Sequence, residues 1–319
     1  MINPAADCWF LTGPTGAGKT KVSLELAQML DAEIISMDSM AIYREMDIGT
    51  AKPSTAQRAT RPHHLVDIVD PNESFSLSNY YRMALELIDQ IHARGKKVLF
   101  VGGTPLYLKA LLRGIFEGPP ADWEFRRQVE EEVRTVGVEA LHQRLEQVDP
   151  LAAARLHPGD VRRIVRALEV RRATGQPISH LQMQFDEGQT AEQCKVFVIQ
   201  WSRENLLKRM DQRVERMFDD GLIDEIRGLR DRYAELSRTA RQAVGYREGL
   251  DYLNNRLDLE QTIERVKIRT RRFAKRQRTW FRGLHECRTV LRSAQDEPRN
   301  IAKWIVRMQQ SGQVVHPAE

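Results

Sequence analysis

Short apolar runs alternate with helical patterns at both ends of the chain, whereas the middle of the chain is helical only. The apolar runs predict five buried strands, at residues 8–11, 33–38, 63–69, 97–101 and 195–199. One of the helices between them is predicted to begin after Ser76, to run to about Arg94 and to end before Gly95. This alternation is typical of an α/β fold in which helices cover both faces of a parallel sheet.

The helical middle of the chain interrupts this pattern. Three helices are predicted there, over 123–136 with Asp122 as the cap, over 139–148, and over 161–173 with Asp160 as the cap. Because strand signals resume at Lys195, we interpret residues 114–193 as an all-helical insertion. The α/β core then comprises residues 1–113 and 194–319.

A glycine-rich stretch lies between the first predicted strand and the first predicted helix. It reads Gly13-Pro14-Thr15-Gly16-Ala17-Gly18-Lys19-Thr20 and fits the phosphate-loop pattern in full. The glycines let successive N–H groups point at one anion, Lys19 adds a cation, and the Thr20 hydroxyl is a ligand for Mg²⁺. The pattern predicts binding of a phosphate or diphosphate. It is shared with ATP-binding proteins, so it does not identify the molecule that carries the phosphates.

Polar side chains follow two other predicted strands. Asp38 ends the second strand, and Thr104 follows the glycine pair that ends the fourth. Because ligands bind at the carboxyl ends of parallel strands, we expect Asp38 to face the same crevice as the phosphate loop. The alternative is that Asp38 only caps the segment that begins at Ser39. The fourth strand ends without the acid that many phosphate-loop NTPases use to hold Mg²⁺, which disfavours a motor or switch ATPase.

Two further features bear on the chemistry of a site. Arg213 borders the buried stripe of a predicted helix over 204–219, because buried methionines lie three residues before it and four after it. Either an anion or a simple salt bridge would satisfy this guanidinium, and the spacing favours neither. His63 and His64 are adjacent on a predicted strand and therefore point to opposite faces, which disfavours a shared metal site.

The positive charge of the chain is concentrated in one segment. The net charge is +5 and the pI is about 9.1, yet Arg265–Arg282 holds nine Lys or Arg and no acid, so the remainder sums to −4. Within this segment Val266, Phe273 and Trp280 lie seven residues apart and predict one packed stripe on a long helix. The remaining face is either a solvated basic surface or a site for a polyanion, and mutual repulsion of the cations favours nucleic acid. Trp280 and Phe281 are candidates for base stacking.

The bulk properties exclude several classes of protein. The three cysteines lie far apart without a C-x-x-C pair, so neither a zinc site nor a disulfide framework is indicated. The sequence shows no apolar run of membrane-span length and no secretory signal at its start. We therefore expect a soluble, cytoplasmic protein, and we expect it to be a monomer.

Together these segments resemble the bacterial tRNA dimethylallyltransferase family, also called tRNA isopentenyltransferases. The motifs that carry the resemblance are the phosphate loop, Asp38-Ser39-Met40, Met46-Asp47-Ile48-Gly49-Thr50-Ala51-Lys52-Pro53, Gly102-Gly103-Thr104 with Leu106-Tyr107, Arg166-Ala167-Leu168-Glu169, Val244-Gly245-Tyr246-Arg247, and Lys275-Arg276-Gln277 with Thr279-Trp280. They occur in order along nearly the whole chain. Asp38-Ser39-Met40 together with Met46–Pro53, and the last of these segments, are far more specific than the phosphate loop.

The resemblance implies a P-loop NTPase-like fold and a prenyl transfer reaction. The dimethylallyl group of dimethylallyl diphosphate would pass to the exocyclic amine of the adenosine 3′ to the anticodon in tRNA, with Mg²⁺ assisting departure of diphosphate. The phosphate loop would then hold the diphosphate of the prenyl donor. Asp38 matches the family's base, Thr104 the residue that steadies the reacting groups, and Arg213 the residue that meets the diphosphate.

The resemblance also implies where tRNA, through its anticodon stem-loop, contacts the protein. The contacts would fall on Asp38, Ser39, Met40 and Ala41; on Arg126; on Arg162, Arg163, Ile164, Val165 and Arg166; on Gln242, Ala243, Val244, Gly245, Tyr246 and Arg247; and on Lys275, Arg276, Gln277, Arg278, Thr279, Trp280, Phe281 and Arg282. The helical insertion is expected to grip the anticodon stem. Two positions depart from the family pattern, since Ala41 stands where many relatives carry glutamine and Pro105 where glycine is common.

Two other classes of protein remain as alternatives. A phosphate-loop kinase for a small molecule, with Asp38 as its base, explains the first half of the chain equally well but gives no role to Arg265–Arg282. A non-catalytic RNA-binding ATPase explains the basic segment but leaves Asp38 and Thr104 without a role. A relative that prenylates free adenine nucleotides is disfavoured by the same basic segment.

Overall fold

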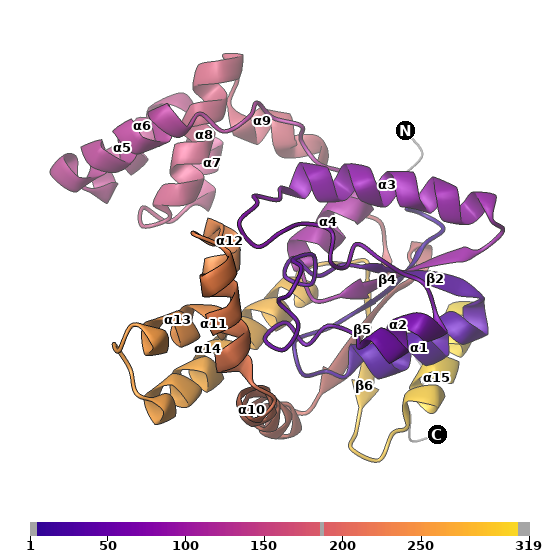
Figure 1. Cartoon of the computed structure of the whole chain (residues 1–319). Coiled ribbons are helices and arrows are strands. Elements are labelled where there is room, and N and C mark those ends of the chain that lie inside the picture. Colours follow the sequence, from indigo (N-terminus) through magenta and orange to yellow (C-terminus); the bar gives the residue numbers. More distant parts are fainter. Residues whose placement is uncertain (1–4, 186–187, 312–319) are drawn as a thin grey trace. The chain divides into compact units, whose positions relative to one another are not determined.

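Six strands form one parallel sheet in the order β3-β2-β4-β1-β5-β6 (Figure 1). The computed structural model describes residues 5–185 and 188–311. The strands are β1 (Trp9–Thr12), β2 (Ala32–Ser36), β3 (His63–His64), β4 (Lys97–Gly102), β5 (Val196–Trp201) and β6 (Cys287–Arg292). The prediction of a parallel sheet is confirmed. The sequence pattern missed β6, because this edge strand has one buried residue and no continuous apolar run.

Helices cover both faces of the sheet. The helices of the α/β core are α1 (Lys19–Leu30), α2 (Thr55–Thr60), α3 (Leu77–Ala93), α4 (Pro105–Arg113), α10 (Arg203–Asp219), α11 (Leu222–Arg232), α12 (Arg238–Arg241), α13 (Tyr246–Leu253), α14 (Leu259–Arg282) and α15 (Pro298–Ser311), with the short 3₁₀ helix η2 (Ala191–Gln193). On one face, α1 and α15 bury Leu26 and Ile301 against the strands. On the other, α3 and α4 bury Ile88 and Leu108. None of the described helices has the length and apolarity that a membrane span requires.

A third hydrophobic cluster joins the loop after β2 to the helices that follow β5. It contains Ile42, Tyr43 and Met46 from the loop together with Ile226 of α11 and Tyr246 of α13. α14 packs on both α10 and α13 within the same unit. The long basic helix is therefore anchored to the elements that border the strand ends.

The helical insertion is a compact unit of its own, over Arg113–Gly188. Its helices are α5 (Trp123–Val136), α6 (Val138–Val148), α7 (Pro150–Arg155), α8 (Val161–Thr174) and α9 (Ile178–Gln182), with the 3₁₀ helix η1 (Met183–Phe185). The caps Asp122 and Asp160 are confirmed, since each accepts the backbone N–H three residues on. The observed end of the unit precedes the predicted one by five residues, because Gln189 already accepts a hydrogen bond from Cys194, two residues before β5.

Two predicted features of local structure are wrong. The strand predicted over 63–69 ends at His64, because Leu65 and Asp67 adopt left-handed φ angles of 57° and 56° that break the extended backbone. His64 contacts the Glu33 carboxylate at 2.7 Å, and His63 contacts the Arg61 carbonyl at 2.8 Å. Both imidazoles are therefore engaged by other residues of the protein, His64 by β2 and His63 by the chain just before β3.

The predicted stripe of Val266, Phe273 and Trp280 on the basic helix is the second error. Val266 is buried, but Phe273 and Trp280 are 36% and 40% exposed. The face that is buried instead comprises Thr262, Val266, Thr270, Ala274, Gln277 and Phe281. A strict seven-residue repeat drifts about 20° per heptad around a straight α-helix, so successive members rotate out of the contact face.

Candidate active site

The phosphate loop adopts the conformation that its glycines allow. Gly13, Gly16 and Gly18 have φ angles of 143°, 80° and 81°. A Cβ on Gly13 would lie 2.7 Å from the carbonyl oxygen of Ile199, so the loop also needs glycine there for space. α1 begins at Lys19, directly after Gly18, with no acid in its first turn. The free N–H groups of this helix start therefore face the loop and favour an anion.

Lys19 lies inside the loop. Its Nζ donates to the carbonyl oxygens of Gly13 and Pro14, at 3.0 Å each. Burial lowers the pKa of this ammonium to about 8, Asp38 acts in the opposite direction, and Arg213 lowers the pKa further. A dianionic ligand at the loop would replace the lost solvation and raise this pKa again.

The affinity of the loop for diphosphate should consequently depend on pH. Lys19 is cationic below its pKa of about 8 and neutral above it, so affinity for inorganic pyrophosphate should fall as the pH rises from 7 to about 9. Binding at pH 8 should take up about half a proton, measured by calorimetry in buffers of different ionisation enthalpy. Lys19→Met is the reference that removes this contribution but keeps the titration of pyrophosphate itself. Equal pH profiles for the two proteins would contradict the prediction.

Asp38 and Thr104 are brought together because β2 and β4 are neighbours in the sheet. A Cβ on Gly102 would lie 1.9 Å from the carbonyl oxygen of Met37, so only glycine permits this close approach of the two strand ends. The Thr104 hydroxyl accepts the N–H of Ser39 at 3.0 Å. The residue after Asp38 is thus tied directly to Thr104.

The two oxygens of the Asp38 carboxylate differ in their hydrogen bonding. Oδ1 accepts the N–H groups of Met40 and Ala41, at 2.8 and 3.4 Å. This is the capping role that the sequence left as an alternative, although the segment that follows is a turn and not a helix. Within the part of the chain that the structure describes, Oδ2 has no hydrogen-bond partner and remains available as an acceptor. Pro105, the departure next to Thr104, is the first residue of α4, a position that suits proline.

Arg213 approaches the same place from α10. Its guanidinium donates to the Thr50 carbonyl at 3.4 Å. Burial lowers the pKa of Arg213 below its ordinary value, and the Asp38 carboxylate acts in the opposite direction. Arg213 has no carboxylate within salt-bridge distance among residues 5–185 and 188–311. Of the two interpretations left open by the sequence, this geometry favours the one in which an anionic ligand meets Arg213.

The loop over Met46–Pro53 forms part of the same cavity and is held by residues from distant elements. Glu225 of α11 accepts the N–H groups of Asp47 and Ile48, at 2.8 and 2.7 Å, and the hydroxyl of Tyr246 at 2.6 Å. Lys52 bridges Asp47 and Asp67. No local pattern in the sequence indicates the role of Glu225, because a lone acid on an amphipathic helix gives no signal.

A cavity of about 70 Å³ joins these parts. Its lining includes Lys19, Thr20, Asp38, Thr50 and Lys52. One site therefore contains the phosphate loop, the Asp38 carboxylate and the Met46–Pro53 loop. The sequence pattern predicts the meeting of the phosphate loop and Asp38.

Comparison with known proteins identifies the family of this chain. The IPP transferase family model matches residues 41–284. The chain belongs to the IPP transferase family. It is 48% identical over 290 residues to a tRNA dimethylallyltransferase of Rhodopirellula baltica, covering 88% of this chain and 87% of that one. It is 45% identical over 272 residues to the tRNA dimethylallyltransferase of Geobacter sulfurreducens, covering 85% and 88%.

Solved structures of IPP transferases share the fold. The tRNA isopentenylpyrophosphate transferase of Bacillus halodurans has a TM-score of 0.69 at 38% identity, covering 96% of this chain and 97% of that one. A eukaryotic dimethylallyltransferase described as acting on tRNA has a TM-score of 0.73 at 28% identity, covering 96% and 77%. The expected P-loop NTPase-like fold is confirmed.

The basic helix of this IPP transferase, α14, carries two kinds of cation. Three of them form ion pairs: Lys267 with Glu215, Arg269 with Glu248, and Arg271 with Asp211. The other six cations have no carboxylate partner among the described residues, and five of them are exposed while Arg278 is half-buried: Arg265, Arg272, Lys275, Arg276, Arg278 and Arg282. The predicted repulsion is thus relieved at three positions and persists at the others. Arg276 also lies over the exposed ring of Phe273, a surface aromatic that the sequence analysis had assigned to the packed stripe.

Eight of the residues matched to tRNA contacts have buried side chains or lack one. They are Ala41, Ile164, Val165, Ala243, Gly245, Tyr246, Gln277 and Phe281. Ile164 and Val165 belong to the core of the insertion, and the Tyr246 hydroxyl is bound to Glu225. The prediction of tRNA contact at these eight positions stays a prediction, and their burial leaves such contact to the backbone or to exposed neighbours. Phe281 is 3% exposed and cannot stack on a base, whereas Trp280 can.

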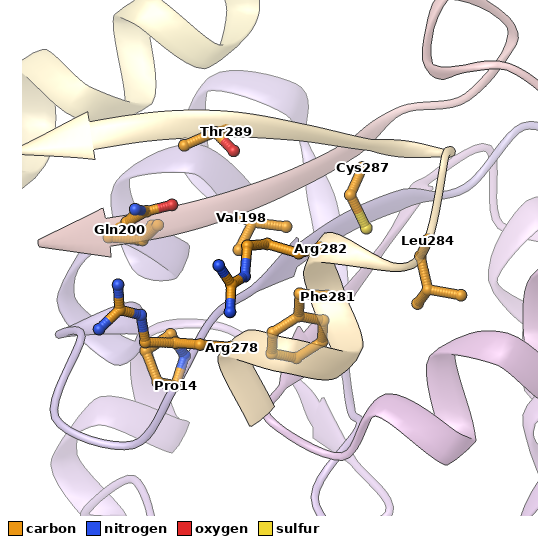
Figure 2. Close-up of a pocket in the computed structure, with 10 residues that line it drawn as sticks. Pro14, Val198, Gln200, Arg278, Phe281, Arg282, Leu284, Cys287 and Thr289 are labelled. Carbon is orange, nitrogen blue, oxygen red and sulfur yellow. The ribbon is translucent and has the colours of Figure 1, made fainter. Parts of the chain in front are cut away.

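A second cavity, of about 190 Å³, lies beneath the last turn of α14 (Figure 2). Arg278 and Arg282 line it together with Pro14 of the phosphate loop, Gln200 of β5 and Thr289 of β6. Figure 2 shows both guanidinium groups between the end of the helix and the strands. The lining contains no acid, so this cavity suits an anionic group.

The insertion of the IPP transferase holds its own arginine cluster. Glu169 is 2% exposed and accepts two hydrogen bonds of 2.8 Å from Arg126. Burial alone would raise the pKa of Glu169, but the hydrogen bonds from Arg126 and Arg166 hold it below its ordinary value. Arg126 and Arg166 are thus oriented by an internal acid, and Arg163 pairs with Asp160. Arg162 is exposed without a carboxylate partner in the described part of the insertion.

Proposed function

We propose that this protein transfers the dimethylallyl group of dimethylallyl diphosphate to the exocyclic amine of the adenosine 3′ to the anticodon in tRNA. The observation that carries the proposal is the meeting of three groups in one cavity: Lys19 of the phosphate loop, Asp38 and the Met46–Pro53 loop. The named relatives are tRNA dimethylallyltransferases, which supports this function over a small-molecule kinase. The unpaired cations of α14 have a role only if the acceptor is a polyanion.

The proposed reaction is one displacement. The adenosine amine forms a bond to the first carbon of the dimethylallyl group while the bond from that carbon to the diphosphate oxygen breaks. Negative charge develops on the departing oxygen, where the loop N–H groups, Lys19 and Arg213 stabilise it. The proton of the amine passes to the free Oδ2 of Asp38. The products are the prenylated adenosine and diphosphate, which leaves with the electron pair of the broken bond.

Thr104 acts on this reaction through orientation. Its hydroxyl holds the backbone of Ser39 and thereby fixes the turn that carries Asp38. A base that is misplaced by about 1 Å can lose two orders of magnitude in rate, so this link matters for catalysis. The adenosine must leave the stack of the anticodon loop to reach Asp38, as enzymes that act on bases require.

The residues present fit Mg²⁺ as a cofactor. Mg²⁺ binds through one or two protein oxygens together with phosphate oxygens and water. The Thr20 hydroxyl lines the same cavity as Asp38 and would hold the ion. When bound, it would neutralise charge on the diphosphate.

The exposed cations supply the proposed tRNA surface. On α14 these are the six unpaired arginines and lysines, and on the insertion Arg162 has the same character. Arg278 and Arg282 at the second cavity would receive a phosphate of the RNA backbone. We propose that the protein acts as a monomer, in the compartment that holds tRNA, the cytoplasm.

The test is transfer of labelled dimethylallyl diphosphate to unmodified tRNA in the presence of Mg²⁺ and without ATP. Label on the adenosine beside the anticodon is the expected result. Turnover of ATP on a small substrate, with no label on RNA, would instead establish the kinase alternative.

A further inference from the structure

Gln277 is a buried amide at the junction of three elements. It lies in α14 between Arg276 and Arg278, yet its side chain is turned inward and the residue is 4% exposed. Its Oε1 accepts the N–H of Thr15 at 2.9 Å, and its Nε2 donates to the Gly103 carbonyl at 2.5 Å. One side chain therefore bridges the basic helix, the phosphate loop and the turn after β4.

Both hydrogen-bond partners of Gln277 lie next to residues of the candidate site. Thr15 belongs to the loop that surrounds Lys19, and Gly103 precedes Thr104. A Cβ on Gly103 would lie 2.7 Å from the Gln277 nitrogen, 3.3 Å from the Gly13 carbonyl and 3.5 Å from Lys19 Nζ. The Gln277 amide thus lies between the phosphate loop and the end of β4, and the Thr104 that follows this strand orients the turn at Asp38.

A carboxamide of this length satisfies both partners. The loop presents a donor and the turn presents an acceptor, so the side chain between them needs one acceptor and one donor. Glutamate has no donor, and methionine offers neither group with comparable strength. Breaking either bond would leave a buried backbone group unsatisfied, which favours a shift of the loop or of the turn.

We propose that Gln277 is a positioning residue that sets the spacing between the phosphate loop and the Thr104–Asp38 pair. This inference rests on the proposed function, because spacing matters most where a donor held by the loop must meet an acceptor held near Asp38. It also makes the RNA-binding helix part of the catalytic framework. The same helix that exposes Arg276 to RNA fixes the diphosphate cradle from its buried side.

The test compares two variants that differ in the bonds they lose. Gln277→Met keeps the length and removes both hydrogen bonds, and Gln277→Glu keeps the shape, loses the donor and adds an anion near Lys19. Both should lower kcat/KM for dimethylallyl diphosphate by at least about tenfold, with the larger loss in Gln277→Glu, while tRNA affinity stays within about twofold. Thr270→Val, an isosteric change on the same buried face, is the matched control.

Binding of inorganic pyrophosphate by calorimetry gives a second readout that needs no transfer. Weaker pyrophosphate binding in both variants, but not in Thr270→Val, supports the positioning role even if the wild-type protein fails to prenylate tRNA, so the two proposals fail separately. If the folded variants keep wild-type kcat/KM and pyrophosphate affinity and lose only thermal stability, Gln277 is a structural residue and the inference is wrong. Loss of tRNA affinity alone would also overturn it.

Discussion

Replacing Asp38 with asparagine should lower kcat for prenyl transfer at least about 100-fold while tRNA affinity and the fold are retained. The reason is that the two oxygens of the carboxylate have different roles. Oδ1 holds the turn by accepting two N–H groups, and an asparagine oxygen accepts them equally well. The amide lacks the basic oxygen that takes the proton of the adenosine amine. Single-turnover transfer rates and tRNA binding, measured side by side, check the expectation.

Asp38→Ala is the companion variant. It removes the base and the turn acceptor together, so it should match the loss in kcat and in addition lose about 1 kcal/mol of stability. Raising the Mg²⁺ concentration tests whether Asp38 acts as a ligand of the metal ion instead of as the base. Recovery of Asp38→Asn activity at high Mg²⁺ would identify the carboxylate as a metal ligand, and turnover above a tenth of the wild-type rate would exclude it as the base.

The part of the candidate site at the phosphate loop and the strand ends was predictable because it depends on rules that act locally or through strand order. Each phosphate-loop residue follows from a spacing that serves one anion. Asp38 and Thr104 meet because they follow neighbouring parallel strands, and Asp122 and Asp160 cap helices through bonds only three residues long. In such cases the physical cause lies either within a few residues of the position concerned or in the order of the strands.

The missed features depend on contacts between residues far apart in the sequence. Gln277 looked like part of a polar helix face, but its partners are Thr15 and Gly103, and no local pattern indicates that a glutamine will be buried. Glu225 holds the loop at Asp47 in the same way. Which face of α14 is buried was also set by tertiary packing, against α10 and α13 and, at Phe281, against the hydrophobic cluster of the sheet. This exchanged the roles of Phe273 and Phe281. Tertiary contacts thus decided the assignments that periodicity alone could not.

The second large effect is expected on RNA binding, because some cations of α14 are paired with acids of the protein and others are not. The double variant Lys275→Gln/Arg276→Gln should reduce the slope of log affinity for tRNA against log salt by about 1.5 units, because two phosphate contacts and their released counterions are lost. Filter binding over a range of salt concentrations measures this slope. Transfer at saturating tRNA should change little, since neither side chain lines the cavity at Asp38.

The same helix offers a control of equal charge. Lys267 and Arg271 are already paired with Glu215 and Asp211, so Lys267→Gln/Arg271→Gln removes two cations that are committed within the protein. Its slope should change by less than about 0.5 units, which separates contact with phosphate from a loss of net charge. Equal changes in the two double variants would mean that only net charge matters. No change in the first would leave Lys275 and Arg276 on a solvated face, and tRNA would have to bind through other cations, such as Arg162 on the insertion.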